Sequence, residues 1–262
     1  MQDVTPSGSD GLLLDRLFPV SATFGWQMEL CERAVIELLA RRIRPQVAID
    51  LGTASGGSLS AVAPFAKKIF SLDVKHSDAL RHTIATTFPH CELVTGDSKV
   101  TLVELLRQLE AGDEALEFVL IDGGHSREQV QADFSNLIRH RPKTRLIAIG
   151  HDSFNPNCRQ GMLEVDWASS PWVVSVELDA VPGILWQQAP ITLQQWGGFL
   201  LVEMRHDGRK GGNLVINQRQ QFKQELCASH TVHQGTVSGT LALALRTARQ
   251  RRVLRAEQAR VA

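Results

Sequence analysis

The stretch VAIDLGTASGGS, residues 47–58, decides the expected fold of this chain. It is a short apolar run that ends in a carboxylate, Asp50, and a glycine cluster. The glycines permit a tight turn and let a ligand lie against the backbone. Residues 59–68 then have helical character, so the loop opens onto a helix N-terminus. The pattern predicts a strand, a glycine-rich turn and a helix.

The same order recurs along the chain. Further strands are predicted at residues 68–73, 92–95, 116–121 and 145–149, and helices at 27–39, 76–88, 100–109 and 127–139. This alternation requires crossovers between parallel strands, and nearly continuous apolar strand cores are typical of burial on both faces. Residues 172–178 and 198–204 predict two more strands, an antiparallel pair at one edge. We therefore expect a Rossmann-like, doubly wound, seven-stranded and mostly parallel α/β sheet with helices on both faces.

The domain organisation follows from this order. We expect an N-terminal segment over residues 1–25, one domain over 26–205 and a C-terminal helical extension over 206–262. In the extension Arg and Gln become more frequent, and residues 241–262 predict a basic amphipathic helix. Packing of this helix on the domain or on a second copy in a homo-oligomer is the favoured interpretation. Membrane or RNA contact is the alternative.

Composition narrows the function classes. The 262 residues are 43% hydrophobic and 21% charged, the balance of an ordinary globular protein. Lys plus Arg equals Asp plus Glu at 28 each, which argues against a nucleic-acid partner. The four cysteines form no CxxC pair, which favours a reducing cytoplasm over a disulfide framework or zinc cluster. The chain begins without a signal-peptide pattern, and no apolar run approaches the roughly 18 residues of a transmembrane segment.

Ligands in open α/β sheets bind beyond the carboxyl ends of the strands. Asp73, at the end of the second strand, is placed to accept hydrogen bonds from both ribose hydroxyls of a nucleoside. Asp97, after the third strand, is placed near an adenine amino group, although a helix N-cap at Asp97 or Ser98 explains these residues almost equally well. The cofactor-binding candidates are Asp50, Gly52, Thr53, Ser55, Gly56, Gly57, Ser58, Asp73, Asp97, Ser98 and Asp122.

The glycine pattern argues against a dinucleotide. A pyrophosphate is typically held by GxGxxG, whereas this chain has GxxxGGS with Ala54 at the middle position. A carboxylate at Asp50 would repel a pyrophosphate, but it suits the ammonium group of a methionine moiety, bound directly or through water.

These motifs together resemble class I S-adenosylmethionine-dependent methyltransferases. The similarity rests on residues 50–58, Asp73, Asp97 and the IDGGHS motif of residues 121–126, and it covers roughly residues 27–204. The IDGGHS motif more narrowly resembles the branch with macrocin-type sugar O-methyltransferases and cephalosporin-hydroxylase-like proteins. The resemblance implies S-adenosylmethionine as cofactor and O-methylation of a small polar acceptor such as a sugar.

The acceptor end is predicted after the fourth and fifth strands. Asp122 and His125 form a candidate catalytic pair, in which His125 is the base because the pKa of imidazole is near neutrality. Asp152 is predicted to join Asp122 in holding Mg²⁺. The sugar-methylating relatives typically carry two adjacent acids here, and His151 replaces the first. His151 and two polar residues of the following segment, Asn155 and Arg159, are candidate substrate contacts, in a segment predicted as a loop over residues 154–161.

Two alternatives stay open at this point. A nicotinamide-dependent oxidoreductase is disfavoured by the glycine loop and by the absence of any Tyr for a Tyr-Lys proton relay. A non-catalytic cofactor-binding subunit that acts through its C-terminal helix is kept open by the departure at His151.

Overall fold

The computed structural model describes residues 23–189 and 192–218. Its helices are α2 (Leu30–Ile43), α3 (Gly57–Val62), α4 (Asp78–Thr87), α5 (Ser98–Ala111), α6 (Arg127–Leu137) and α7 (Pro156–Leu163), with short 3₁₀ turns at Ala63–Phe65 and Trp167–Ser169. Its strands are β1 (Val47–Leu51), β2 (Lys68–Asp73), β3 (Cys91–Thr95), β4 (Leu116–Ile121), β5 (Arg145–His151), β6 (Val173–Ala189), β7 (Thr192–Arg205) and β8 (Val215–Asn217). In the described residues no helix combines the length and the apolar character needed to cross a membrane.

The strands form one sheet in the order β3-β2-β1-β4-β5-β7-β6-β8. Strands β1 to β5 are parallel, and β7 runs antiparallel to β5, with Ile147 opposite Glu203. The predicted Rossmann-like, mostly parallel α/β sheet is confirmed. Because β1 lies at the point where the strand order reverses, the loops after β1 and β4 face each other there.

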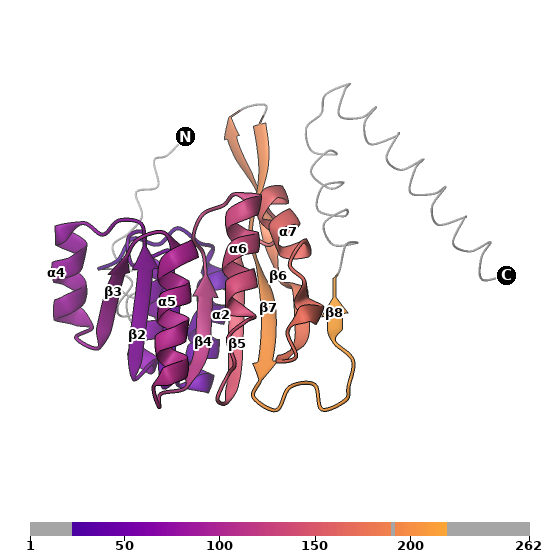
Figure 1. Ribbon diagram of the computed structural model, residues 1–262. Helices are drawn as coiled ribbons and strands as arrows, with labels where there is room; N and C mark the ends of the chain where they lie inside the picture. The colour runs from indigo at the N-terminus through magenta and orange to yellow at the C-terminus, as the bar shows by residue number, and fades with distance from the viewer. Residues whose placement is uncertain (1–22, 190–191, 219–262) are drawn as a thin grey trace, which may run out of the picture. The chain divides into compact units, whose positions relative to one another are not determined.

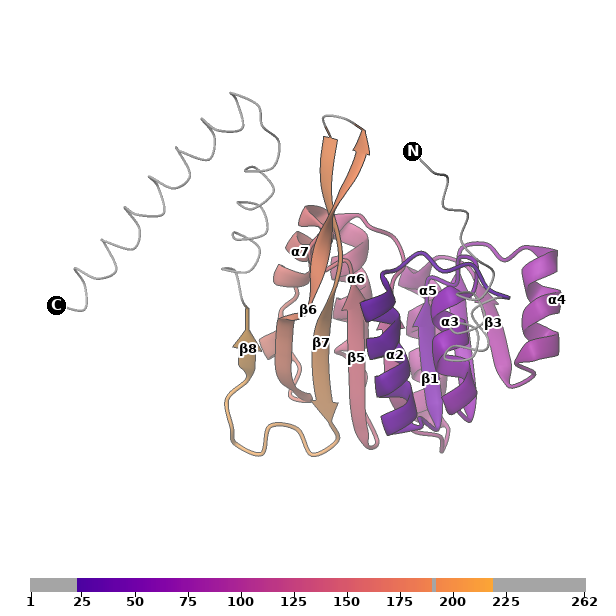
Figure 2. The same ribbon diagram turned by 180° about the vertical axis from the view of Figure 1, so that it is seen from behind.

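Helices cover both faces of the sheet (Figures 1 and 2). Side chains of a strand alternate between the faces, so β1 sends Ile49 into the core beneath α5 and α6 and Ala48 into the core beneath α2, α3 and α4. Phe134 of α6 and Ile36 of α2 are fully buried in these two cores. Strands β1, β2, β4 and β5 are therefore buried on both faces, as their apolar runs predict, whereas the edge strand β3 is only partly buried.

The described sheet has one strand more than expected. Val215–Asn217 pairs in parallel with β6 over Ser175–Glu177. All three of its side chains are exposed, so the segment lacks the buried alternation that marks a strand in a sequence. The expected boundary at residue 205 thus falls before the last strand. The basic helix predicted at residues 241–262 lies outside the described residues.

The segment expected to be a loop over residues 154–161 is mostly helix. Asn155 is the N-cap of α7, and its side-chain oxygen accepts hydrogen bonds from the backbone N–H groups of Asn157 and Cys158. Pro156 occupies the first helical turn, where the missing N–H has no intrahelical role. An Asn-Pro pair suits both a turn and a helix start, which is why the prediction was wrong here.

Candidate active site at the carboxyl ends of the strands

The two regions predicted as cofactor end and acceptor end are contiguous. Gly52, in the loop after β1, has a φ of +102°, and a Cβ placed on it would collide with the backbone carbonyl of Asp122. The backbone N–H of Asp122 donates to the carbonyl of Leu51 at 2.7 Å. Only glycine permits this approach of the loops after β1 and β4.

Two other loop glycines are explained by the chain's own packing. A Cβ on Gly56 would collide with the ring of Phe24, and one on Gly57 would meet the backbone of Gly25 and the ring of Trp26. Phe24 is buried, and Gly25 forms an isolated bridge with Gly56. Residues 24 and 25, expected in a separate N-terminal segment, therefore belong to the fold. Of the candidates in this loop, only Ser55 is exposed.

Asp50 is fully buried at the base of this loop. The hydroxyl of Ser58 donates to its Oδ1 and that of Ser71 to its Oδ2, each at 2.7 Å. Burial raises the pKa of Asp50 to about 7, although both serine hydrogen bonds oppose the rise. The structure therefore gives Asp50 no direct contact with a ligand's ammonium group, and the carboxylate fixes the start of α3 through Ser58.

A directed chain of hydrogen bonds ties the ends of three strands together. Ser71 uses its hydrogen on Asp50, so Thr53 donates to Ser71 at 2.7 Å and the Nε2 of His76 donates to Thr53 at 3.0 Å. The Nδ1 of His76 lies 2.8 Å from Oγ1 of Thr95. In the neutral ring this nitrogen accepts from Thr95, and burial favours the neutral ring because it lowers the pKa of His76. Sequence reasoning missed His76, which has no motif around it.

Asp73 lies beside the glycine loop, at the end of β2. Its Oδ2 accepts from the backbone N–H of Ala54 at 2.9 Å, and its Oδ1 accepts from that of Lys75 at 3.2 Å. The side chain is half-buried, so it reaches solvent next to the loop. Contact of this carboxylate with a ribose stays a prediction.

The residues after β3 begin helix α5 in the structure. Asp97 is exposed and is the N-cap of α5, where it accepts from the backbone N–H of Lys99 at 2.9 Å. Ser98 donates to Asp133 of α6 at 2.7 Å and accepts from Gln129 at the same distance. Burial raises the pKa of Asp133 to about 6. Sequence reasoning missed this buried acid, because it lies within a helix and follows no strand.

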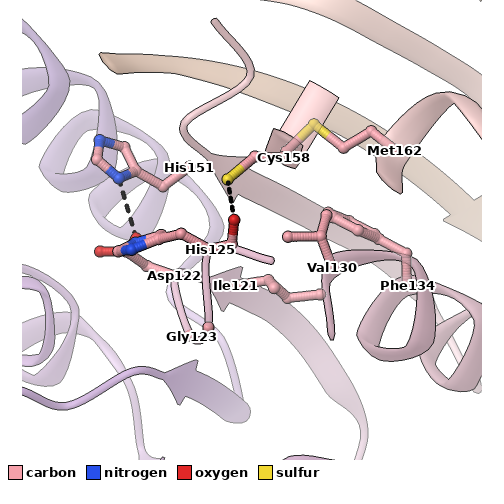
Figure 3. Close-up of a pocket in the computed structure, with 10 residues that line it drawn as sticks. Ile121, Asp122, Gly123, His125, Val130, Phe134, His151, Cys158 and Met162 are labelled. Atoms are coloured by element: carbon pink, nitrogen blue, oxygen red, sulfur yellow. Dashed lines mark hydrogen bonds and ion pairs between the residues drawn. The ribbon is translucent and has the colours of Figure 1, made fainter. Parts of the chain in front are cut away.

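Of the residues predicted for the acceptor end, Asp122, His125 and His151 come together after β4 and β5 (Figure 3), and Asp152 lies beside them. The Nδ1 of His151 lies 3.0 Å from Oδ1 of Asp122 and 3.6 Å from Oδ1 of Asp152. The Nε2 of His125 lies 3.2 Å from Oδ2 of Asp152 and 3.5 Å from Oδ1 of Asp122. We call these four residues, Asp122, His125, His151 and Asp152, the acid–histidine cluster.

Glu32 of α2 supports this cluster from behind and was missed by the sequence analysis. Its Oε1 lies 3.3 Å from Nε2 of His151 and accepts from the backbone N–H of Gly198 at 2.6 Å. Its Oε2 accepts from the backbone N–H of Glu29 at 2.8 Å. The only local signal is a Glu in the first turn of a helix, which is typical of a capping box.

The charges within the cluster shift one another's pKa values. Burial would lower the pKa of His151, but Asp122, Glu32 and Asp152 outweigh it and raise the pKa well above its usual value. Burial would raise the pKa of Asp122, yet the two histidines lower it. The hydrogen bond to Asp122 raises the pKa of His125, and burial raises that of Asp152. Such mutual shifts are typical of functional sites.

Asp152 is held in a strained conformation. Its φ is +60°, a left-handed value that a residue with a side chain rarely adopts. The backbone N–H of Gly197 donates to its Oδ1 at 2.6 Å, and its side chain is 3% exposed. The surrounding contacts therefore fix the carboxylate at the end of β5, as is common where strain serves a function.

Two predicted substrate contacts have other roles. The Asn155 side chain caps α7, as described above. The buried guanidinium of Arg159 forms a two-pronged ion pair with Asp179, at 2.6 and 3.2 Å. Both side chains are structural in this geometry, and His151 is enclosed by carboxylates. Contact of Asn155, Arg159 and His151 with an acceptor stays a prediction, and polar atoms of all three side chains are engaged by the chain itself.

A small pocket adjoins the cluster (Figure 3). Asp122, His125 and His151 line it together with the apolar side chains of Phe134 and Met162. The ring of Trp196 packs edge-on against His125, with centroids 5.5 Å apart. A carboxylate–histidine pair at a partly apolar wall can orient a hydroxyl group and accept its proton.

Neither a protein-family model nor a curated protein sequence matches the chain. Solved structures do. An O-methyltransferase from Bacillus cereus in complex with SAH is 16% identical, with a TM-score of 0.49 and coverage of 78% of this chain and 94% of that one. The TomG O-methyltransferase of tomaymycin synthesis from Streptomyces achromogenes, in complex with SAM, is 15% identical, with a TM-score of 0.49 and coverage of 78% and 92%.

A protein described as a candidate O-methyltransferase from Klebsiella pneumoniae is 15% identical, with a TM-score of 0.50 and coverage of 78% of this chain and 92% of that one. At such identity the likeness establishes the fold alone. The chain therefore has the Rossmann-like fold of the class I S-adenosylmethionine-dependent O-methyltransferases that its strand-end motifs resemble.

Proposed function

We propose that the chain is an S-adenosylmethionine-dependent methyltransferase that methylates a hydroxyl oxygen of a small polar acceptor, such as a sugar. The observation that supports it most directly is the contact between two loops. Gly52 brings the loop beside Asp73 against the backbone of Asp122, so a nucleoside site and a carboxylate–histidine pair share one end of the sheet.

The residues around the β1 loop fit the adenosyl part of the cofactor. Asp73 reaches solvent beside the loop and offers acceptor oxygens for two ribose hydroxyls. Asp97 is exposed after β3, within the region proposed for the adenine. Burial pushes the pKa of Asp50 to about 7 and the carboxylate faces two serines, so its role is to fix the loop.

The transfer itself is a displacement at carbon. S-adenosylmethionine supplies an electrophilic methyl group, so the acceptor oxygen forms a bond to the methyl carbon while the carbon–sulfur bond breaks and S-adenosylhomocysteine leaves. His125 takes the hydroxyl proton. Its Nε2 faces Asp122 and Asp152, which leaves Nδ1 as the accepting atom of the neutral ring. The two carboxylates then stabilise the imidazolium. No step of this transfer runs through a metal ion.

Methyl transfer to a panel of sugars and glycosides, measured as S-adenosylhomocysteine formed, tests this proposal. For an acceptor that turns over, we expect His125→Ala to lower kcat by roughly 10²- to 10⁴-fold, the usual contribution of a general base. The exposed His206 provides the control, because His206→Ala removes a histidine remote from the cluster.

Binding of S-adenosylhomocysteine to His125→Ala should stay close to that of the unmodified chain, because His125 touches the acceptor side. Unchanged turnover in His125→Ala would remove the base assignment. Binding of the cofactor with no turnover on any acceptor of the panel would favour a non-catalytic role instead.

A further inference from the structure

We propose that Asp122, His151 and Asp152 bind a divalent first-row transition-metal ion, of the class of Zn²⁺ and Co²⁺, in preference to Mg²⁺. The inference goes beyond the proposed methyl transfer and does not depend on it, since metal binding can be measured without S-adenosylmethionine. It rests on the spacing of the three ligand atoms, on their chemical type and on the support behind His151.

The spacing suits ligands of one ion. The three residues offer ligand atoms within 4.8 Å of one another, with Nδ1 of His151 3.0 Å from Asp122 and 3.6 Å from Asp152. Two ligands at about 2.1 Å from one ion, at angles between octahedral and tetrahedral, lie about 3.0 to 3.4 Å apart. The two separations from His151 lie close to this range, and the carboxylates must move closer together where the set spans up to 4.8 Å.

The chemical types of the three donor atoms do not suit Mg²⁺. Magnesium requires near-ideal octahedral oxygen coordination and usually keeps several waters. The cluster instead places an imidazole nitrogen between two carboxylates. Imidazole together with carboxylate suits the borderline ions of the first transition row, for which a nitrogen ligand raises affinity. The Mg²⁺ expected from the two acids alone is therefore a poor match for this set.

Glu32 gives His151 the support that a metal-binding histidine needs. Such a histidine almost always directs its second ring nitrogen to a carboxylate or carbonyl, which fixes the ring and raises its basicity. Here Nδ1 faces Asp122 and Nε2 lies 3.3 Å from Oε1 of Glu32. Glu32 is itself held by the backbone N–H groups of Gly198 and Glu29. The Glu32 carboxylate thus lies beside the second ring nitrogen of His151, and a small rotation of the ring would align the two for a hydrogen bond.

The chain's own contacts also hold the proposed ligand side chains in place before any ion binds. The backbone N–H of Gly197 holds Asp152, and the His151 side chain is only 9% exposed. A competing explanation is that His151 carries a proton and acts as an internal cation between the carboxylates. In that case the cluster takes up no metal, which makes the two explanations separable by direct binding.

The experiment uses the full chain, stripped with a chelator and titrated by calorimetry with Zn²⁺, Co²⁺ and Mg²⁺ in the absence of cofactor. We expect one site that binds Zn²⁺ and Co²⁺ at least about 100-fold more tightly than Mg²⁺. This comparison needs no variant. Mg²⁺ binding as tight as Zn²⁺ binding, or no binding of any of the three ions, would overturn the proposal.

Variants locate the site. His151→Asp replaces the nitrogen donor by an oxygen donor, and we expect the ratio of Co²⁺ to Mg²⁺ affinity to fall by at least tenfold. Glu32→Gln keeps an oxygen for Gly198 and removes the charge behind His151, and we expect roughly 10- to 100-fold weaker Co²⁺ binding. His206→Ala should match the unmodified chain. Circular dichroism confirms that each variant is folded.

Visible absorption of bound Co²⁺ reports the ligand type independently. We expect bands of nitrogen and oxygen coordination without a thiolate charge-transfer band. The described residues include three free cysteines, Cys31, Cys91 and Cys158, so a thiolate band would place the ion elsewhere and overturn the assignment. Unchanged Co²⁺ affinity in a folded His151→Asp variant would overturn it as well.

Discussion

At the scale of single residues, Asp50 shows how a carboxylate can serve a binding loop without touching the ligand. Its side chain is fully buried, and both oxygens accept hydrogen bonds from serines. The sequence places an acid before a glycine turn, which predicts a polar contact there. The sequence does not show that Asp50 is fully buried or that Ser58 and Ser71 bind both of its oxygens.

The burial of Asp50 predicts a dependence of stability on pH. Burial raises its pKa in the folded chain to about 7, above the value near 3.9 of an unfolded chain. Between these values the folded chain holds a proton that the unfolded chain releases, so the contribution is complete below about pH 4 and is lost as the pH rises through 7. We expect the unfolding free energy of Asp50→Asn, relative to the unmodified chain, to rise between pH 5 and pH 8.

Urea denaturation at the two pH values measures this change, which is on the order of 3 kcal/mol because the contribution falls over about two pH units between pH 5 and pH 7. Asp113 is exposed near the opposite ends of the strands, so Asp113→Asn is the matched control and should follow the unmodified chain. Parallel pH profiles of Asp50→Asn and the unmodified chain would show that Asp50 is ionised in the folded state.

The cluster residues differ in how well a sequence can find them. Asp122, His125 and Asp152 each follow a parallel strand, and the carboxyl ends of such strands meet at one edge, so their convergence could be predicted. Glu32 comes from a helix about 90 residues before Asp122 in the sequence and looks like an ordinary capping residue. Its role depends on how α2 packs on the sheet, which no local pattern encodes.

At the scale of elements, the loop between β1 and α3 depends on the missing side chain of Gly52. We expect Gly52→Ala to destabilise the chain by several kcal/mol and to abolish binding of S-adenosylhomocysteine, because the new Cβ forces the loops after β1 and β4 apart. Thermal unfolding and calorimetry measure the two effects.

Gly211 is the matched control for that substitution. It also has a positive φ, +80°, but nothing lies within 4 Å of a Cβ placed there. Gly211→Ala should therefore lower the free energy of unfolding only by the backbone strain, about 1 to 2 kcal/mol. It should leave the binding of S-adenosylhomocysteine unchanged. Equal effects of the two substitutions would mean that strain, and not the approach of the two loops, explains Gly52.

The helices and strands also show which elements a sequence pattern can predict and which it cannot. Strands β1 to β5 were predicted because each is a short apolar run that ends in polar or small residues, and a predicted helix follows each of the first four. Helix α7 was missed because Asn155 and Pro156 suit a turn as well as a capped helix start. Strand β8 was missed because it is three residues long and exposed, so its position depends on pairing with β6 rather than on its own pattern.

At the scale of the whole molecule, the proposed methyl transfer requires that one end of the sheet acts as a single site. The parallel strands bring the β1 loop, Asp73 and the acid–histidine cluster to that end, and helices cover both faces behind them. The fold could be predicted because burial on both faces leaves a strong hydrophobic signal. The acceptor could not, because it depends on the shape of side chains around the pocket.

Calorimetric titration of the full chain with S-adenosylmethionine, S-adenosylhomocysteine and NAD shows whether this end of the sheet binds an adenosyl sulfur compound. We expect the two sulfur compounds to bind at one site and NAD not to bind, and we expect Asp73→Ala to weaken binding at least tenfold while Asp113→Ala does not. Binding of NAD in place of the sulfur compounds, or equal binding by the Asp73 and Asp113 variants, would show that the proposed cofactor site is wrong.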